Sequence, residues 1–267
     1  MARPMNIASP TPVNRIVLLG ASNLTMSLPI VIKTAQRVCG GPNQFLIATG
    51  HGRSYGVYSR VLFRGLPGII ECGLWDDLAK SPGLPTFALL TDLGNDIGYE
   101  QPPDRLMGWV CWCLDRLAER EARIIVTALP VPSLELLSSS QYRFFRTLLF
   151  PDLNLSWEQA LSRVRVVDQA LREFCSGQDV AFIEQRREWY GTDPVHIRRH
   201  QRPGAYLEIL KPWLEPGREA PPIVKTGLRD RWRLRLLTSQ SRCLFGFEQH
   251  RNQPCGMLPD GSTISLY

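Results

Sequence analysis

The stretch that decides the fold is Arg15-Ile-Val-Leu-Leu-Gly-Ala-Ser-Asn-Leu-Thr25. Its apolar run, bounded by Gly20, predicts a buried β-strand, and the periodic pattern after Thr25 predicts a helix. Ser22 then lies at a strand-to-helix turn, where its hydroxyl is open to substrate and its backbone N–H lies at a helix N-terminus that favours anions. Such a serine becomes a nucleophile only with a base, an orienting carboxylate and further oxyanion donors.

The same alternation of strand and helix patterns continues along the chain. Further strands are predicted at residues 44–49, 86–93, 123–129 and 180–183. Helices are predicted at residues 25–37, from Val57 to Phe63, after Pro102 and after the capping box Ser156-Trp-Glu-Gln159. Strands that alternate with helices predict parallel β-α-β units with helices on both faces of an α/β fold, and a site at the carboxyl ends of the strands.

Length and charge predict one catalytic domain with an appended tail. The chain has 267 residues, 44% of them hydrophobic, which suffices for one substantial core. We expect a catalytic domain at residues 1–216 and a basic C-terminal extension at residues 217–267, joined by a linker rich in proline and charge. The extension holds eight basic and four acidic residues, and therefore most of the net charge of +6. This asymmetry favours an anionic surface or partner.

The extension itself is predicted to be rich in β-structure. Arg231, Arg233 and Arg235 alternate with apolar residues, a two-residue period that favours a strand with one basic face. Pro259-Asp-Gly261 predicts a hairpin turn. Because no candidate catalytic group lies beyond His196, a chain that ends near Pro216 is expected to keep its chemistry.

Several classes of protein are excluded by simpler features. No apolar run is long enough to span a membrane, and the first residues lack the pattern of a signal peptide, so we expect a cytoplasmic protein. The seven cysteines have no regular spacing, which predicts reduced and mostly buried thiols. No Cys/His cluster has metal-ligand spacing, so neither a metal nor an organic cofactor is expected.

Polar residues that follow the other strands could complete a site with Ser22. In Asp193-Pro-Val-His196, a carboxylate three residues before a histidine can hold the imidazole in the correct tautomer. Asn95 offers an amide that could donate to an oxyanion, and Gly52 leaves its backbone N–H open to close approach. Because parallel strands end at one edge of a sheet, these groups are expected to converge there.

Four short blocks occur in order over roughly residues 15–214: Gly20-Ala-Ser-Asn-Leu24, Gly50-His-Gly-Arg-Ser54, Gly94-Asn-Asp96 and Asp193-x-x-His196. In this order they resemble the four blocks of the SGNH (GDSL-type) hydrolases. The resemblance implies a flavodoxin-like three-layer α/β/α sandwich, with the small β-rich extension added to it. It also implies hydrolysis of a small-molecule, lipid or carbohydrate ester without a cofactor. A nucleic-acid partner is not expected, because the basic tail lacks the interleaved aromatic residues of a single-strand binder.

The resemblance also assigns roles to residues. Ser22 becomes the nucleophile, His196 the base and Asp193 its orienting acid. The N–H of Ser22, the N–H of Gly52 and the Asn95 amide become the oxyanion hole. Two positions depart from the Gly-Asp-Ser-Leu signature: Ala21 replaces its aspartate and Asn23 its leucine. The glycine block is short enough that Gly50 could take the place of Gly52.

Three other interpretations stay open at this point. Gly52-Arg-Ser-Tyr-Gly56 matches the Gly-x-Ser-x-Gly elbow of α/β-hydrolases, which would make Ser54 the nucleophile. The same turn, with Glu71 about twenty residues on, approximates a dinucleotide site. A non-catalytic binding module would instead use the Arg-rich tail on an anionic partner.

The connection from Val131 to Leu155 carries more apolar residues than a connection needs. They are Leu134, Leu136, Leu137, Phe144, Phe145, Leu148, Leu149 and Phe150. We expect this segment to cap the catalytic edge and line an acyl pocket, the alternative being an ordinary helix packed on the sheet. In the first case, replacing Phe144 and Phe145 with alanine would change the preferred acyl length.

Overall fold

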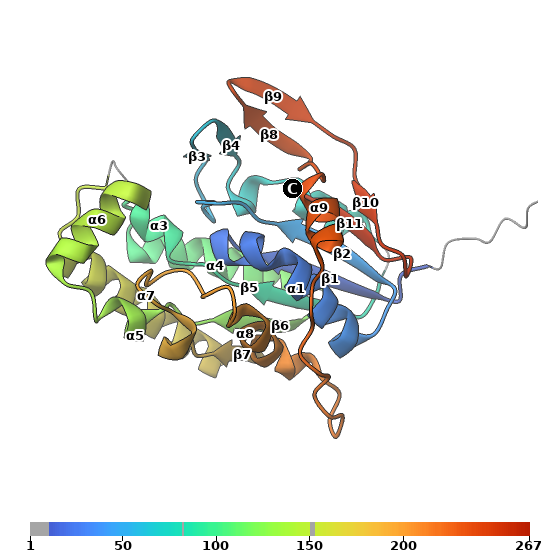
Figure 1. Ribbon diagram of the computed structural model, residues 1–267. Coiled ribbons are helices and arrows are strands. Elements are labelled where there is room, and N and C mark those ends of the chain that lie inside the picture. The colour runs from blue at the N-terminus through green and yellow to red at the C-terminus, as the bar shows by residue number, and fades with distance from the viewer. Residues whose placement is uncertain (1–10, 82, 150–152) are drawn as a thin grey trace, which may run out of the picture.

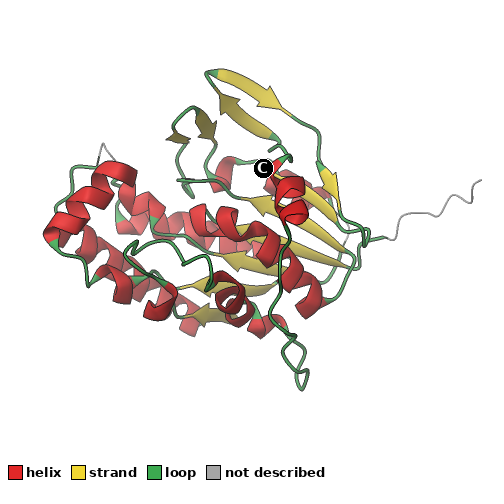
Figure 2. Ribbon diagram, viewed as in Figure 1, coloured by secondary structure: helices red, strands yellow, loops and turns green. Residues whose placement is uncertain are grey.

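A seven-stranded sheet forms the centre of the molecule (Figures 1 and 2). The computed structural model describes residues 11–81, 83–149 and 153–267. The strand order is β10-β11-β2-β1-β5-β6-β7, in which all neighbours from β11 to β7 pair in parallel and β10 is antiparallel. The bounds are β1 Asn14–Leu19, β2 Asn43–Ala48, β5 Thr86–Leu90, β6 Arg123–Thr127, β7 Val180–Ile183, β10 Gly256–Met257 and β11 Thr263–Leu266. The run β2-β1-β5-β6-β7 has the flavodoxin-like order.

Helices cover both faces of this sheet, so the fold has three layers. On one face lie α2 (Leu74–Lys80), α4 (Pro103–Ala118) and α7 (Trp157–Ser176), and on the other α1 (Ser22–Cys39) and α8 (Arg202–Ile209). In β1, Val17 and Leu19 pack against the first group, and Ile16 and Leu18 against the second. A strand buried on both faces reads as a continuous apolar run, and the predicted three-layer α/β/α fold is confirmed.

The helix predicted from Val57 to Phe63 is wrong. These residues belong to a hairpin of β3 (Ser59–Val61) and β4 (Arg64–Leu66). Strand β4 pairs with β8 (Ser241–Leu244), which pairs with β9 (Phe247–His250), so a second, four-stranded sheet forms. The hairpin pairs with β8, about 180 residues further along the chain, and such long-range strand pairing overrides a short local pattern.

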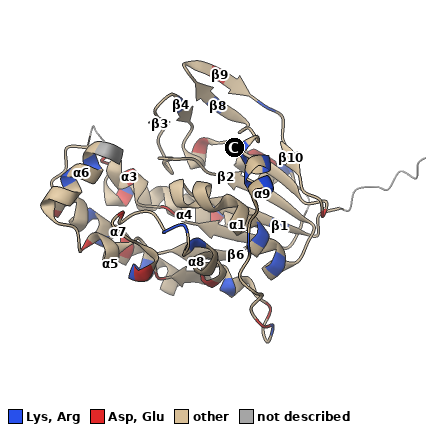
Figure 3. Ribbon diagram, viewed as in Figure 1, with Lys and Arg blue, Asp and Glu red and all other residues tan. Residues whose placement is uncertain are grey.

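The strand predicted around Arg231, Arg233 and Arg235 is also wrong. These residues lie on the helix α9 (Leu228–Arg235), whose Arg positions are blue in the ribbon of Figure 3. Asp230 accepts a hydrogen bond from the Gly227 N–H at 2.9 Å and pairs with Lys33 of α1 at 2.6 Å. The two-residue period was too short to decide between strand and helix, because leucine and arginine are good helix formers.

Extra C-terminal strands are present as predicted, and β10 and β11 form the predicted hairpin around Pro259-Asp-Gly261. Strand β11 also lies inside the central sheet, next to β2. The expectation that the tail is dispensable is therefore replaced by the opposite one, although the domain boundary near residue 216 stays a prediction. Among the described residues, no helix is both long and apolar enough to cross a bilayer.

Candidate active site

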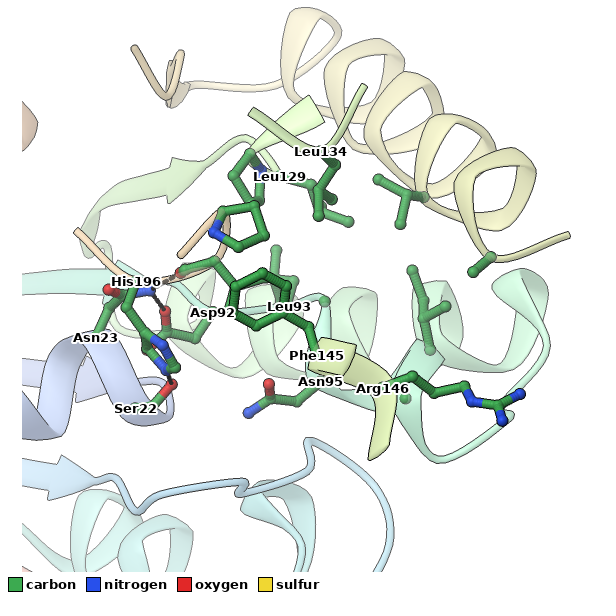
Figure 4. A pocket seen from close by; sticks show the side chains of 18 of the residues that line it. Ser22, Asn23, Asp92, Leu93, Asn95, Leu129, Leu134, Phe145, Arg146 and His196 are labelled. Atoms are coloured by element: carbon green, nitrogen blue, oxygen red, sulfur yellow. Dashed lines mark hydrogen bonds between the residues drawn. The ribbon is translucent and has the colours of Figure 1, made fainter. Parts of the chain in front are cut away.

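The three predicted catalytic residues meet at the carboxyl edge of the central sheet, and Figure 4 shows two of them, Ser22 and His196. Ser22 is the first residue of α1 and follows β1 directly, whereas Asp193 and His196 lie in the loop between β7 and α8. The Ser22 Oγ lies 2.9 Å from His196 Nε2, and His196 Nδ1 lies 2.7 Å from Asp193 Oδ2. The distances form a continuous hydroxyl, imidazole and carboxylate relay, which is the geometry needed to activate a serine.

Asp193 is held in place by its own loop. Its Oδ1 accepts the backbone N–H groups of Val195 and His196 at 3.0 and 3.1 Å, which leaves Oδ2 for the imidazole. Burial alone would raise the pKa of Asp193, but the hydrogen bond and charge of His196 outweigh it and lower the pKa below its ordinary value. An ionised Asp193 requires a proton on His196 Nδ1 and leaves Nε2 free to accept the Ser22 proton.

The predicted oxyanion donors Gly52 and Asn95 line the same cavity as Ser22, whereas Gly50 does not line it. Gly52 has a φ of +65°, and a Cβ there would lie 2.4 Å from Val61 Cγ2, so only glycine fits. Its carbonyl accepts the Tyr99 hydroxyl at 2.6 Å, which fixes the loop. Asn95 Nδ2 donates one hydrogen to the Arg53 carbonyl at 3.2 Å and keeps a second hydrogen for a ligand.

Ser54 has a structural place in this loop and does not reach a substrate. Its side chain is 0% exposed and donates to the Asp96 carboxylate, and its Oγ accepts the N–H groups of Gly56 and Val57 at 3.0 and 2.8 Å. The loop continues into β3 rather than into a helix. The structure therefore contradicts both the α/β-hydrolase elbow and the dinucleotide site, since each needs a helix after the turn.

Asp96 ties the glycine loop to Asn95. Its carboxylate also accepts the backbone N–H of Tyr55, at 3.2 and 3.0 Å to its two oxygens. Burial raises its pKa to about 6, while the hydrogen bonds from Ser54 and Tyr55 act in the opposite direction. Because Asp96 follows Asn95 directly, this contact sets the distance between the two proposed oxyanion donors.

Sequence reasoning missed a group of hydrogen bonds made by Asn23 and Asp92, which we call the clasp. The Asn23 amide donates to Asp92 Oδ1 at 2.9 Å and to the Val195 carbonyl at 2.8 Å, and its Oδ1 accepts the Ile197 N–H at 2.8 Å. These contacts hold the chain on both sides of His196. Asp92 also accepts the N–H groups of Ala21 and Leu24 at 2.9 and 3.1 Å.

These contacts explain one of the two departures from the Gly-Asp-Ser-Leu signature, the asparagine at position 23. Asp92, which follows β5, accepts N–H groups at the start of α1, where the backbone N–H groups of a helix have no carbonyl partners within the helix. The amide at position 23 then joins the serine turn to the histidine loop. The signal in the sequence was the asparagine where the signature has leucine, combined with an aspartate four residues before Asp96.

Replacing Asn23 with leucine is expected to lower kcat by roughly 10- to 100-fold and to change KM far less, because the histidine loop loses its two hydrogen bonds to Asn23, and the contact of Asn23 with Asp92 is lost as well. Steady-state kinetics on an activated ester measures this, and the labelling rate of Ser22 by a fluorophosphonate should fall in parallel. Asn252→Leu, an exposed asparagine, is the control. Unchanged kcat and labelling rate in folded Asn23→Leu protein would contradict a positioning role.

A cavity of about 400 Å³ opens beside Ser22. Its walls are largely apolar, and many come from the segment predicted to cap the edge, which forms α5 (Val131–Leu134) and α6 (Ser139–Leu149). From this segment Leu134, Phe145 and Arg146 line the cavity, as Figure 4 shows, and so do Leu137, Tyr142 and Leu153. Leu136 and Phe144 are exposed instead. Phe150 and the side chains of Leu148 and Leu149 lie outside the described residues.

Comparisons with known proteins agree with this fold. A carbohydrate acetylesterase family member from Sinorhizobium meliloti has a TM-score of 0.50 at 13% identity, over 74% of this chain and 96% of that one. An aryl esterase of M. smegmatis gives 0.45 at 16% identity, over 71% and 93% of the two chains. No protein-family model and no curated protein matches the chain. At 13% identity the likeness to the acetylesterase family member shows the SGNH-like fold alone, in agreement with the four sequence blocks.

Proposed function

We propose that this chain is a serine hydrolase that cleaves carboxylic esters. The observation that carries the proposal is the relay from Ser22 Oγ to His196 Nε2 at 2.9 Å and from His196 Nδ1 to Asp193 Oδ2 at 2.7 Å, beside a mainly apolar cavity. The SGNH-like fold and the order of the four blocks support the same function. The rival binding module leaves this relay without a purpose.

In the proposed reaction the Ser22 oxygen attacks the ester carbonyl while His196 Nε2 takes the hydroxyl proton. The new imidazolium is stabilised by the Asp193 carboxylate, whose pKa is lowered. His196 then gives the proton to the leaving alkoxide, and an acyl-enzyme on Ser22 remains. Water attacks this acyl-enzyme with His196 again as the base, which releases the acid and restores the serine.

The negative charge that develops on the carbonyl oxygen needs donors that are already in place. We propose the Ser22 N–H at the start of α1, the Gly52 N–H and the second hydrogen of the Asn95 amide. Preorganised donors of this kind each contribute roughly 3 to 4 kcal/mol to transition-state stabilisation. The contacts of Asp96 and Tyr99 support this role, since they fix the glycine loop relative to Asn95.

Hydrolysis of 4-nitrophenyl esters by the purified protein tests the proposal directly. Turnover should follow Michaelis–Menten kinetics and should be lost when a fluorophosphonate reacts with one serine for each chain. Absence of turnover across acetyl to decanoyl esters, together with absence of labelling, would contradict an esterase and would favour the binding module.

The apolar cavity is proposed to hold the acyl group. Phe145→Ala should move the preferred acyl length toward longer chains, because the lost ring enlarges a wall of the cavity. The measurement is kcat/KM over a series of 4-nitrophenyl esters. Phe144→Ala is a matched control, since the neighbouring ring is 64% exposed and does not line the cavity. The same shift in both variants, or in neither, would refute this acyl pocket.

A further inference from the structure

We propose that two neighbouring hairpin turns form a docking surface for an anionic lipid interface. Leu62 and Phe63 form the turn between β3 and β4, and Phe245 and Gly246 the turn between β8 and β9. The Phe245 N–H donates to the Phe63 carbonyl at 2.8 Å, and the two rings stack with their centroids 4.9 Å apart. We call residues 62–63 and 245–247 the turn pair.

The turn pair presents large apolar side chains to solvent. Leu62 is 85% exposed, Phe63 and Phe245 are each 64% exposed, and Phe247 is 74% exposed. The second sheet projects from the body of the molecule, and the turn between β8 and β9 lies at its outer end (Figure 1). Single exposed apolar residues are ordinary on a protein surface, whereas four of them gathered at two adjoining turns of a projecting sheet point to a contact surface.

The backbone of both turns disfavours the residues that occupy it. Leu62 has a φ of 53° and Phe245 a φ of 52°, in the left-handed region where hairpin turns normally carry glycine, asparagine or aspartate. Leucine and phenylalanine therefore cost stability at these positions, and their high exposure means that burial within the chain does not offset the cost. Local strain that burial within the chain does not offset points to a binding role.

The net positive charge of the two hairpins indicates the kind of partner that the turn pair would bind. Residues 58–66 and 241–251 contain Arg60, Arg64, Arg242 and Arg251, and Glu248 as their one acidic residue. Arg60 lies two residues before Leu62 and is exposed. A narrow apolar tip with arginines behind it matches a lipid surface, where apolar side chains enter the acyl region and arginines meet anionic headgroups.

The position of the turn pair connects it to the candidate active site. Val61, the residue directly before Leu62, lines the cavity beside Ser22. A docked chain would therefore bring the mouth of the cavity close to the lipid. That consequence rests on the proposed ester hydrolysis, so the lipid would be a source of substrate. Docking itself does not depend on catalysis and can be measured without it.

The test is co-sedimentation of full-length Ser22→Ala protein with two kinds of vesicle, one of phosphatidylcholine alone and one of phosphatidylcholine and phosphatidylglycerol in equal parts. We expect binding to the anionic vesicles that weakens with salt. Leu62→Asn combined with Phe245→Asn should lower the partition coefficient by roughly tenfold or more, because two apolar side chains would no longer enter the acyl region of the bilayer. Arg60→Gln should weaken binding to the anionic vesicles and reduce its salt dependence.

Two controls keep the result interpretable. Val166→Asn replaces a side chain of α7 that is 52% exposed, and its binding should equal that of the parent protein. Asparagine suits the left-handed turn positions, so the double variant should unfold at the same temperature as its parent or a higher one. Absence of vesicle binding, or equal binding by the double variant, would overturn the proposal. So would self-association that the double variant abolishes without any vesicle binding, which would assign the turn pair to a second copy of the chain.

Discussion

Replacing Ser22 with alanine is expected to lower kcat for an activated ester by roughly 10⁴- to 10⁶-fold, as loss of a serine nucleophile does in other triads. The physical reason is that His196 Nε2, 2.9 Å from the Ser22 oxygen, would have no hydroxyl to deprotonate. The fold should remain, because Ser22 makes no side-chain cap for α1. Steady-state kinetics measures the loss, and peptide mapping after fluorophosphonate treatment should place the adduct on Ser22.

Ser54→Ala is the matched comparison for this experiment. It removes a buried hydroxyl that bonds to Asp96 and to two backbone N–H groups, so it should lower stability by about 1 to 3 kcal/mol. Its kcat should fall far less than that of Ser22→Ala, and its adduct should still map to Ser22. An adduct on Ser54, or full activity in Ser22→Ala, would refute the proposed nucleophile.

Removing residues 259–267 is expected to abolish folding, although no proposed catalytic group lies there. The deletion takes away β11, whose Ile264 and Leu266, together with Tyr267, are buried in the core. Each such side chain contributes roughly 2 to 5 kcal/mol, so the three together rival the roughly 5 to 15 kcal/mol of net stability of a typical domain. The edge of β2 would also lose its parallel partner.

Tyr267 adds a direct link to the candidate site. Its hydroxyl donates to Asp77 at 2.6 Å, and its backbone oxygen accepts from the buried side chain of Arg53, the residue after Gly52. Solubility, circular dichroism and hydrolysis of a small ester measure the effect of the deletion. Replacing β8 and β9, residues 241–250, with a short glycine linker is the control, and this variant should stay folded. A folded, active chain without residues 259–267 would show that β11 is an accessory strand.

The sequence by itself determined the five parallel strands from β2 to β7 in the central sheet and which strand ends meet at the candidate site. Strands β1, β2, β5, β6 and β7 are short apolar runs bounded by glycine, proline or polar residues. This local pattern suffices because the first four are largely buried, while β7, at the edge of the sheet, is half-buried. Once parallel pairing was predicted, topology required the residues after each strand to meet. Ser22, Gly52 and Asn95 could therefore be placed together before any contact was known, although their catalytic roles stay proposals.

Only the tertiary structure decided the features that depend on distant partners. Residues 57–63 have a local pattern compatible with a helix, but they form a hairpin because Arg64 and Gly65 pair with Leu244 and Cys243. Asn23 donates to the carbonyl of Val195, more than 170 positions away. Ser54 donates to the buried carboxylate of Asp96, 42 positions away, so its hydroxyl is not available as a nucleophile. Local propensity is worth tenths of a kcal/mol for each residue, whereas a buried strand pairing or carboxylate contact is worth several times more. Where the two disagreed in this chain, the long-range contacts prevailed.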